Sequence, residues 1–252
     1  GETQPRRPAD WIGFCLGALE GQQQLAAQRQ RIVQCLQARR VRGPLVVAEV
    51  GLAGAGRDAL VQQCGAGLLP VRLDDRDGER CPRVRAPRAT RIATPDGSAA
   101  ALDAALHALD AGAAPHALID NGPRWWCVDL DTADAVRALR PPLTEITALC
   151  LASDAVGLAV CGRARSTDHA LAVRAFCPAD GIPEDPVTGS ANAALAAWLH
   201  GDGGLEGIGT RYIASQGREL GRDGRVSVEI DAEGEVWIGG QVQPVIRGTL
   251  DW

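Results

Sequence analysis

Residues 181–192 read GIPEDPVTGSAN and lead directly into the apolar segment 193–199, AALAAWL. Two prolines and two glycines place Glu184 and Asp185 on a stiff loop, because proline fixes its backbone angle and glycine allows a tight turn. The Gly189-Ser190 step is typical of a helix start, and the helix that follows has too few polar residues to lie on a surface. The stretch therefore predicts a buried helix that begins beside a pocket for an anion.

We expect Ser190 to be the N-cap of this helix, with the next free N–H groups at the positive end of the helix dipole. A carboxylate or phosphate of a substrate would be held there. Asp185 and Glu184 lie a few residues upstream, so that an acid/base group can reach the bound anion. On the residues alone, a purely structural turn followed by a core helix remains the alternative, since Asp-Pro and Thr-Gly are common turn dipeptides.

Composition limits the classes of partner. The chain has 252 residues, 46% of them hydrophobic, and a net charge of −5. Apart from Arg39-Arg40-Val41-Arg42 no basic run stands out, which argues against a nucleic-acid surface. No apolar stretch has the length of a membrane span, and no apolar segment typical of a signal peptide follows the two early arginines. We therefore expect a cytoplasmic protein with neither nucleic acid nor membrane as partner.

Cysteine spacing gives no indication of a metal site. The eight cysteines form no C-x-x-C pair and no tight cluster with the four histidines, so no metal is expected. At this chain length, and without a secretion signal, they are expected to be reduced and mostly buried.

Hydrophobic periodicity gives a coarse order of elements. Helical patterns are expected over 11–38 and 98–111, and strands over 44–50 and on to about residue 87. A linker is expected after Pro115. Further on, the pattern predicts strands at 125–130, 157–161, 171–176, 211–216, 225–230, 235–239 and 242–247, helices at 132–139 and 190–200, and a helix or turn at 143–149.

The run Phe176-Cys177-Pro178, followed by residues 181–191, resembles the signature of the PhzF-like isomerases of phenazine biosynthesis. The resemblance extends over about four fifths of the chain. It includes residues 60–71, 83–87, 119–124, 215–222, 226–228, 236–240 and 247–250.

This resemblance implies an α+β fold like that of diaminopimelate epimerase, in which two similar domains each wrap strands around a central helix and the ligand lies between them. Residues 1–115 would form the first domain and 116–252 the second, with a return of the last strand to the first domain left open. The helix 190–200 would be the central helix of the second domain. Residues 1–48 are atypical, so the first domain is expected to be incomplete.

The resemblance also implies a function. The protein would be a cofactor-independent isomerase or epimerase that moves a proton on a small carboxylic acid, and it would form a homodimer. Asp185 is the expected catalytic residue of the second domain, as an acid/base or as a group that orients the substrate, while Gly189, Ser190 and Ala191 are expected to bind the substrate carboxylate. The expected partner is a small carboxylate-bearing metabolite, and no cofactor is expected.

Two family segments are missing from this sequence. These are the Asn-Leu-Ser-Glu-Thr segment, whose glutamate is the catalytic acid/base of the first domain, and the Gly-His-Pro-Thr segment that starts the first central helix. The glutamate therefore cannot be carried over, and Glu49 is expected to be an ordinary strand residue. We favour a lost or non-native N-terminal segment, with two alternatives: a diverged member that uses another base, and an inactive homologue that only binds its ligand. Cys177 is not expected to act as a nucleophile, although diaminopimelate epimerase uses a pair of cysteines.

A dinucleotide site is the second alternative. Residues 54–59, GAGRDA, fit G-x-G-x-x-A after a strand, and Asp74 and Asp75 follow about 20 residues later, as in NAD(P)-dependent dehydrogenases. The helix after these glycines would end by Gly65, which is too short for a βαβ crossover. Residues 68–71 just beyond already have the pattern of extended chain, so the glycines are expected to form a loop, and the family resemblance implies a hairpin over Leu60 to Val71.

Overall fold

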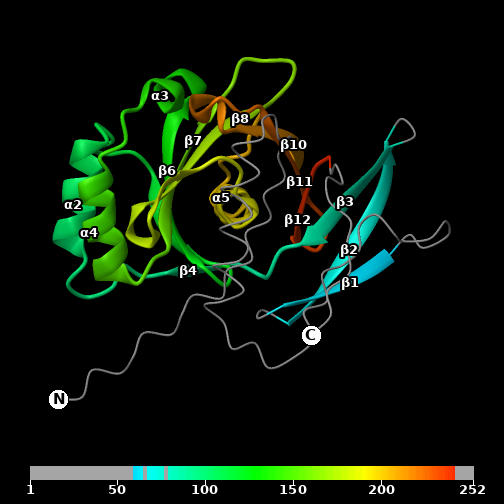
Figure 1. Ribbon diagram of the computed structural model, residues 1–252, viewed down its shortest axis with the longest axis horizontal. Helices are drawn as coiled ribbons and strands as arrows, with labels where there is room; N and C mark the ends of the chain where they lie inside the picture. The colour runs from blue at the N-terminus through cyan, green and yellow to red at the C-terminus, as the bar shows by residue number, and fades with distance from the viewer. Residues whose placement is uncertain (1–58, 65–66, 77–78, 242–252) are drawn as a thin grey trace, which may run out of the picture.

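The computed structural model describes residues 59–64, 67–76 and 79–241 (Figure 1). The helices expected over 11–38, the strands at 44–50 and 242–247 and the glycines at 54–56 lie outside these residues.

One long curved sheet contains every described strand. Its order is β1-β2-β3-β12-β11-β10-β8-β7-β6-β5-β4, and β9 pairs with β8 off this path. The pairs β6–β7 and β8–β10 are parallel and the other neighbours are antiparallel. The strands are β1 (Ala59–Cys64), β2 (Gly67–Arg76), β3 (Glu79–Arg85), β4 (Thr90–Ile92), β5 (His116–Asp120), β6 (Arg124–Thr132), β7 (Gly157–Arg163), β8 (Leu171–Cys177), β9 (Ile182–Asp185), β10 (Arg211–Gln216), β11 (Gly224–Ile230) and β12 (Val236–Gly239).

The sheet curves around a single helix, α5 (Gly189–Gly201), which Figure 1 shows inside the hollow of the sheet. Small side chains such as Ala191 and Ala194 let the strands approach closely, and Leu195 and Trp198 fill the space between them. All four are at most 4% exposed. The absence of a polar face on this helix is thus explained by its position, because the sheet covers it on most sides.

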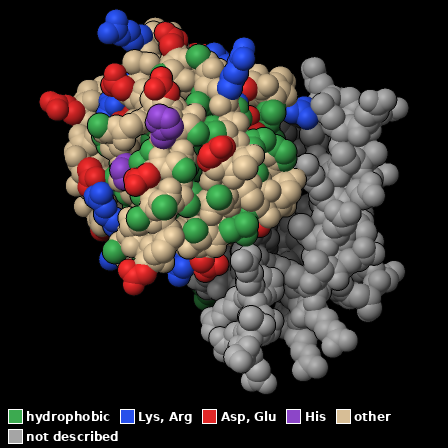
Figure 2. All heavy atoms as spheres, turned by 90° about the vertical axis from the view of Figure 1, so that its left-hand side faces the viewer, with side chains coloured by type: hydrophobic (Ala, Val, Ile, Leu, Met, Phe, Trp, Pro, Cys, Tyr) green, Lys and Arg blue, Asp and Glu red, His purple; other side chains and the backbone are tan. Residues whose placement is uncertain are grey.

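Three helices cover the outer face of the same sheet. They are α2 (Ala99–Ala108), α3 (Ala133–Ala138) and α4 (Leu143–Ser153). A second apolar cluster lies between them and the strands, with Trp126 and Phe176 as its largest members. Seen from the side of α2 and α4, acidic and basic side chains are scattered among apolar ones and do not gather in one patch (Figure 2).

Strands β7 and β8 are buried along nearly their whole length, because α5 covers one face and the outer helices the other. This explains why both were readable from the sequence as continuous apolar runs. The strand and helix expectations from residue 125 to 239 are confirmed, apart from differences of a few residues at element ends.

The expected hairpin over Leu60 to Val71 is also confirmed, as the antiparallel pair β1–β2. Ala59, where a dinucleotide fold would have its helix, is the first residue of strand β1. Asp74 lies in β2, and its carboxylate forms an ion pair with Arg83, in which Asp74 Oδ2 lies 2.6 Å from Arg83 Nε. Residues 59–64 therefore form a strand, whereas a dinucleotide-binding unit would have its first helix there.

Two expectations were wrong. The linker expected after Pro115 is strand β5, whose Ala117, Leu118 and Ile119 are all buried and pair with β6 across a tight turn. The loop expected to carry Glu184 and Asp185 is the short strand β9, which pairs with β8 across an irregularity. In both cases the segment is too short for its periodicity to identify it as a strand.

No helix among the described residues is long and apolar enough to cross a membrane.

Candidate active site

The candidate site lies where β9 ends and α5 begins. Asp185 is the last residue of β9 and pairs with Ala175 of β8. Only Pro186, Val187 and Thr188 separate Asp185 from Gly189, the first residue of α5. This short connection limits their separation, and the hydrogen bond from Thr188 Oγ1 to Asp185 Oδ2 at 2.7 Å holds Asp185 against the residue that precedes the helix.

The expectation that Ser190 caps the helix was wrong. The N-cap is Thr188, with the extended backbone angles φ −123° and ψ 103°, and Ser190 is already the second residue of the helix. Its hydroxyl Oγ accepts a hydrogen bond from Trp125 Nε1 at 3.2 Å. The Thr188 side chain does not cap either, because its Oγ1 donates to Asp185 Oδ2 at 2.7 Å. Both hydroxyls thus hydrogen-bond to other side chains, Ser190 to the buried Trp125 and Thr188 to the half-buried Asp185, instead of capping the helix.

The N–H groups of Gly189, Ser190 and Ala191 consequently have no hydrogen-bond acceptor in the described part of the chain. They are three consecutive donors at the positive end of a helix of 13 residues. Such a helix start binds a carboxylate or phosphate through its N–H groups and its dipole. The sequence had predicted these three residues for this role, and the geometry is compatible with it.

Gln216, at the end of β10, is the centre of the hydrogen bonds around the site, and its side chain is fully buried. Its Oε1 accepts from the Thr188 N–H at 3.0 Å and from Asn192 Nδ2 at 2.8 Å. Its Nε2 donates to the Asp185 carbonyl at 2.9 Å and to Thr188 Oγ1 at 3.0 Å. One amide thus joins β9, the helix start and β10 into a rigid unit.

The turn after Gln216 fits closely against the site. Gly217 has φ +90°, and a Cβ there would lie 2.4 Å from the Pro186 carbonyl oxygen. Only glycine combines this backbone angle with this close approach. The resemblance of residues 215–222 to the family was a signal for this turn, although it did not reveal the role of Gln216.

A buried ion pair fixes β9 from the other side. Arg174 Nε and Nη2 donate to the two oxygens of Glu184 at 2.9 and 2.8 Å, and the side chains are only 5% and 8% exposed. Arg174 Nη1 also donates to the carbonyls of Val136 and Leu139, at 3.3 and 2.6 Å. Glu184 therefore holds the strand that carries Asp185, and its carboxylate is fully engaged.

Asn121, between β5 and β6, approaches the helix from the opposite side. Its Nδ2 donates to the Ser190 carbonyl at 2.9 Å, while its buried Oδ1 accepts no hydrogen bond from any residue that the structure describes. A buried acceptor without a donor is unusual in a folded protein. The family-like run at 119–124 marked this turn in the sequence, but not the contribution of Asn121.

Cys177 lies at the end of β8 and is 3% exposed. Burial, and after it the negative charge of Asp185, raise the pKa of the Cys177 thiol above its ordinary range. A thiol that stays protonated is a poor nucleophile, in agreement with the expectation for this residue. Among the described residues, no group of three or more His, Cys, Asp or Glu side chains is arranged to hold a metal ion.

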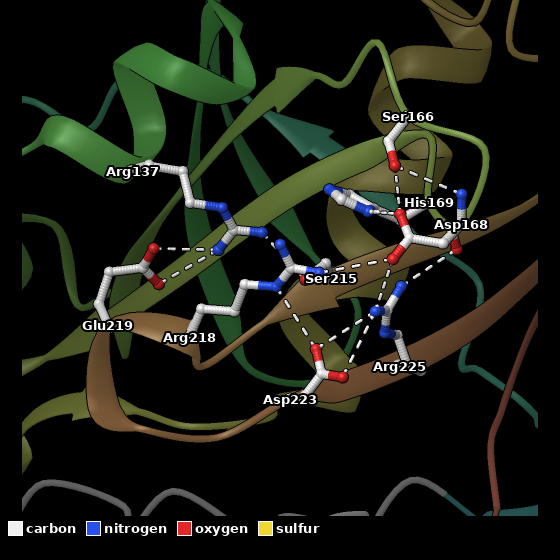
Figure 3. A network of polar contacts seen from close by, with 9 residues as sticks. All are labelled: Arg137, Ser166, Asp168, His169, Ser215, Arg218, Glu219, Asp223 and Arg225. Carbon is white, nitrogen blue, oxygen red and sulfur yellow. Dashed lines mark hydrogen bonds and ion pairs between the residues drawn. The ribbon is translucent and has the colours of Figure 1, made fainter.

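A second polar network lies on the outer side of β10 and β11 (Figure 3). Arg137 of α3 donates to Glu219 at 3.0 Å and to Ser215 Oγ at 2.9 Å. Further out, Arg225 Nη2 lies 2.7 Å from Asp168 Oδ2. Ser166, Arg225 and His169 all hydrogen-bond Asp168, and these contacts hold the pKa of its carboxyl well below the usual range. The arginines and aspartates around Asp168 are 33–65% exposed, unlike the buried Gln216 of the site, whereas Arg137 and Glu219 are more buried.

Comparisons with known proteins agree with this arrangement. A family model described as "Phenazine biosynthesis-like protein" (PhzC-PhzF) matches residues 44–248. "Antisense-enhancing sequence 1" of Schizosaccharomyces pombe is 26% identical over 210 residues, which are 80% of this chain and 70% of that relative. An uncharacterized isomerase of Deinococcus radiodurans is 39% identical over 113 residues, which are 43% of this chain and 36% of the relative.

Solved structures show the same fold. A "Predicted Epimerase" from Pseudomonas aeruginosa superposes with a TM-score of 0.58 at 25% identity, over 78% of this chain and 68% of that one. A PhzF-family protein of Bacillus anthracis superposes with a TM-score of 0.57 at 21% identity, over 73% of this chain and 65% of that one. The chain has the mixed α+β fold of the diaminopimelate epimerase-like proteins, and it belongs to the phenazine biosynthesis-like, or PhzF-like, family of isomerases and epimerases.

Proposed function

We propose that this protein is a cofactor-independent isomerase or epimerase that moves a proton on a small carboxylic acid. The substrate carboxylate binds to the N–H groups of Gly189, Ser190 and Ala191, and Asp185 takes up and returns the proton. The observation that supports this most is a set of three N–H donors without an acceptor in the described ranges, close to a firmly held carboxylate. Cofactor independence rests on the family resemblance.

The physical argument concerns the charge that develops during the reaction. Removal of a proton next to a carboxylate moves an electron pair toward the carboxylate oxygens, which become more negative. Donors already in place at a helix start stabilise that charge without reorganising, and one such donor contributes on the order of 10²–10³ in rate in other enzymes. A positioned acid/base group contributes roughly 10²–10⁴ more.

Deuterium incorporation tests this proposal. The dialysed protein is incubated in D₂O with chiral α-amino acids, α-hydroxy acids and β,γ-unsaturated carboxylic acids, without added metal or cofactor. Mass spectrometry then measures deuterium at carbon, and we expect incorporation into at least one acid class.

Asp185→Asn should reduce that incorporation by about 10²–10⁴, because the proton acceptor is lost. Asp180→Asn is the matched control, since it changes another aspartate five residues upstream and should leave the rate within about twofold. Binding of an acid without incorporation of deuterium would contradict the enzyme proposal and favour a homologue that only binds. Equal rates for both variants would remove Asp185 from the mechanism.

A further inference from the structure

Hydrogen bonds of fixed direction lead from Gln216 through Thr188 to Asp185. The start of this chain is determined by the backbone: the Thr188 N–H can only donate, so the Gln216 atom 3.0 Å from it must be the oxygen Oε1. The Asp185 carbonyl can only accept, so the Gln216 atom 2.9 Å from it must be the nitrogen Nε2. Two independent backbone contacts therefore determine which end of the Gln216 amide is the oxygen and which is the nitrogen.

The direction of the Thr188 hydroxyl follows from the orientation of the amide. Gln216 Nε2 donates to Thr188 Oγ1 at 3.0 Å. The hydroxyl proton therefore points away from Gln216 and toward the other contact of Oγ1, Asp185 Oδ2 at 2.7 Å. Gln216 is 0% and Thr188 2% exposed, so water does not compete for these groups. A proton on Oδ2 would force the hydroxyl proton to turn away, so that Thr188 could no longer donate to Asp185 and would lose its only acceptor among the described residues.

We propose that Gln216 and Thr188 are positioning residues that keep Oδ2 of Asp185 a permanent hydrogen-bond acceptor, so that the proton moved in the reaction is carried on Oδ1. This inference rests on the proposed role of Asp185. In the forward step the substrate C–H bond breaks, its electron pair moves into the substrate carboxylate and a new O–H bond forms at Oδ1. In the return step that O–H bond breaks and the proton goes back to a substrate carbon. Oδ2 accepts from Thr188 throughout.

Carbon-13 NMR of the full chain with labelled aspartate carboxyls tests this without any substrate. The Asp185 signal is assigned by its loss in Asp185→Asn. Thr188→Val removes the hydroxyl at nearly constant shape and should raise the titration midpoint of Asp185 by about one pH unit, because the charged form loses a donor. Thr188→Ser keeps the hydroxyl and should restore the midpoint to within a few tenths of a unit. An unchanged midpoint in folded Thr188→Val would overturn the inference, as would an equal rise in Thr188→Ser.

A measurement on the unaltered chain applies even if Thr188→Val does not fold. The Thr188 hydroxyl proton should be visible by NMR in contact with the Asp185 carboxyl both above and below its titration midpoint. Loss of that contact on protonation would place the proton on Oδ2 and contradict the inference.

The exchange assay separates this inference from the proposed function. If the unaltered chain incorporates deuterium, the acid side of the Thr188→Val pH–rate profile should move up by the same amount as the titration midpoint, with KM nearly unchanged. If the unaltered chain incorporates none, the proposed function fails, while the titration still decides how Thr188 acts on Asp185.

Discussion

Two polar networks flank strand β10, and they differ in almost every respect. The inner network joins Gln216, Thr188 and Asp185 with Asn192, and its amide side chains are at most 2% exposed. The outer network joins arginines and aspartates around Asp168, whose side chain is 46% exposed. The inner network uses mostly neutral groups with fixed donors and acceptors, whereas the outer network uses charges that water can also satisfy.

This difference indicates which network can position a reacting group. A buried hydrogen bond is costly to leave unmade, so each inner contact restricts its partners to one arrangement. Exposed ion pairs contribute little, because water screens them and their long side chains lose conformational freedom. Precision at Asp185 is therefore expected to come from the inner network and from the Arg174–Glu184 pair beneath it.

The largest expected effect comes from breaking that pair. Arg174→Met leaves the Glu184 carboxylate buried without its partner, which should lower the free energy of unfolding by about 3–5 kcal/mol. Arg225→Met makes the same substitution in the outer network and should cost far less. Urea unfolding of both variants provides the measurement. Similar losses in the two variants would mean that burial does not distinguish the networks.

The smallest expected effect concerns Asp168. Its pKa is lowered in the folded chain by hydrogen bonds from Ser166, Arg225 and His169, so its carboxylate stabilises the fold above the ordinary aspartate range. Asp168→Asn should therefore lower the melting temperature slightly at pH 7, and by less than Arg174→Met does. The difference in melting temperature from the unaltered chain should shrink below about pH 4, because the carboxylate of the unfolded chain then takes up a proton. It should also shrink in high salt, which screens the ion pairs. A melting-temperature difference that grew as the pH fell would contradict this prediction.

Much of the fold was readable from the sequence because its core is so apolar. The central helix and strands β7 and β8 have long runs of buried residues, and such runs carry a strong signal. Strands β5 and β9 have only five and four residues, and what makes them strands is pairing with a neighbour that the local sequence does not contain.

The candidate site was readable only in part. The stretch from Gly181 to Asn192 marked its position, but Ser190 was wrongly expected to cap the helix. Capping rules consider only neighbouring residues, whereas Ser190 bonds to Trp125, 65 residues away in the sequence. The role of Gln216 likewise depends on contacts 24–31 residues away, which no local pattern encodes.

The most direct test of the account asks which network binds the substrate anion. The backbone amide signals of the nitrogen-15-labelled chain are followed while each acid that shows deuterium exchange is added. We predict the largest shifts at Gly189, Ser190 and Ala191, because their N–H groups at the start of α5 have no acceptor among the residues that the structure describes. Shifts confined to Arg218 and Arg225, with those three amides unchanged, would contradict the account.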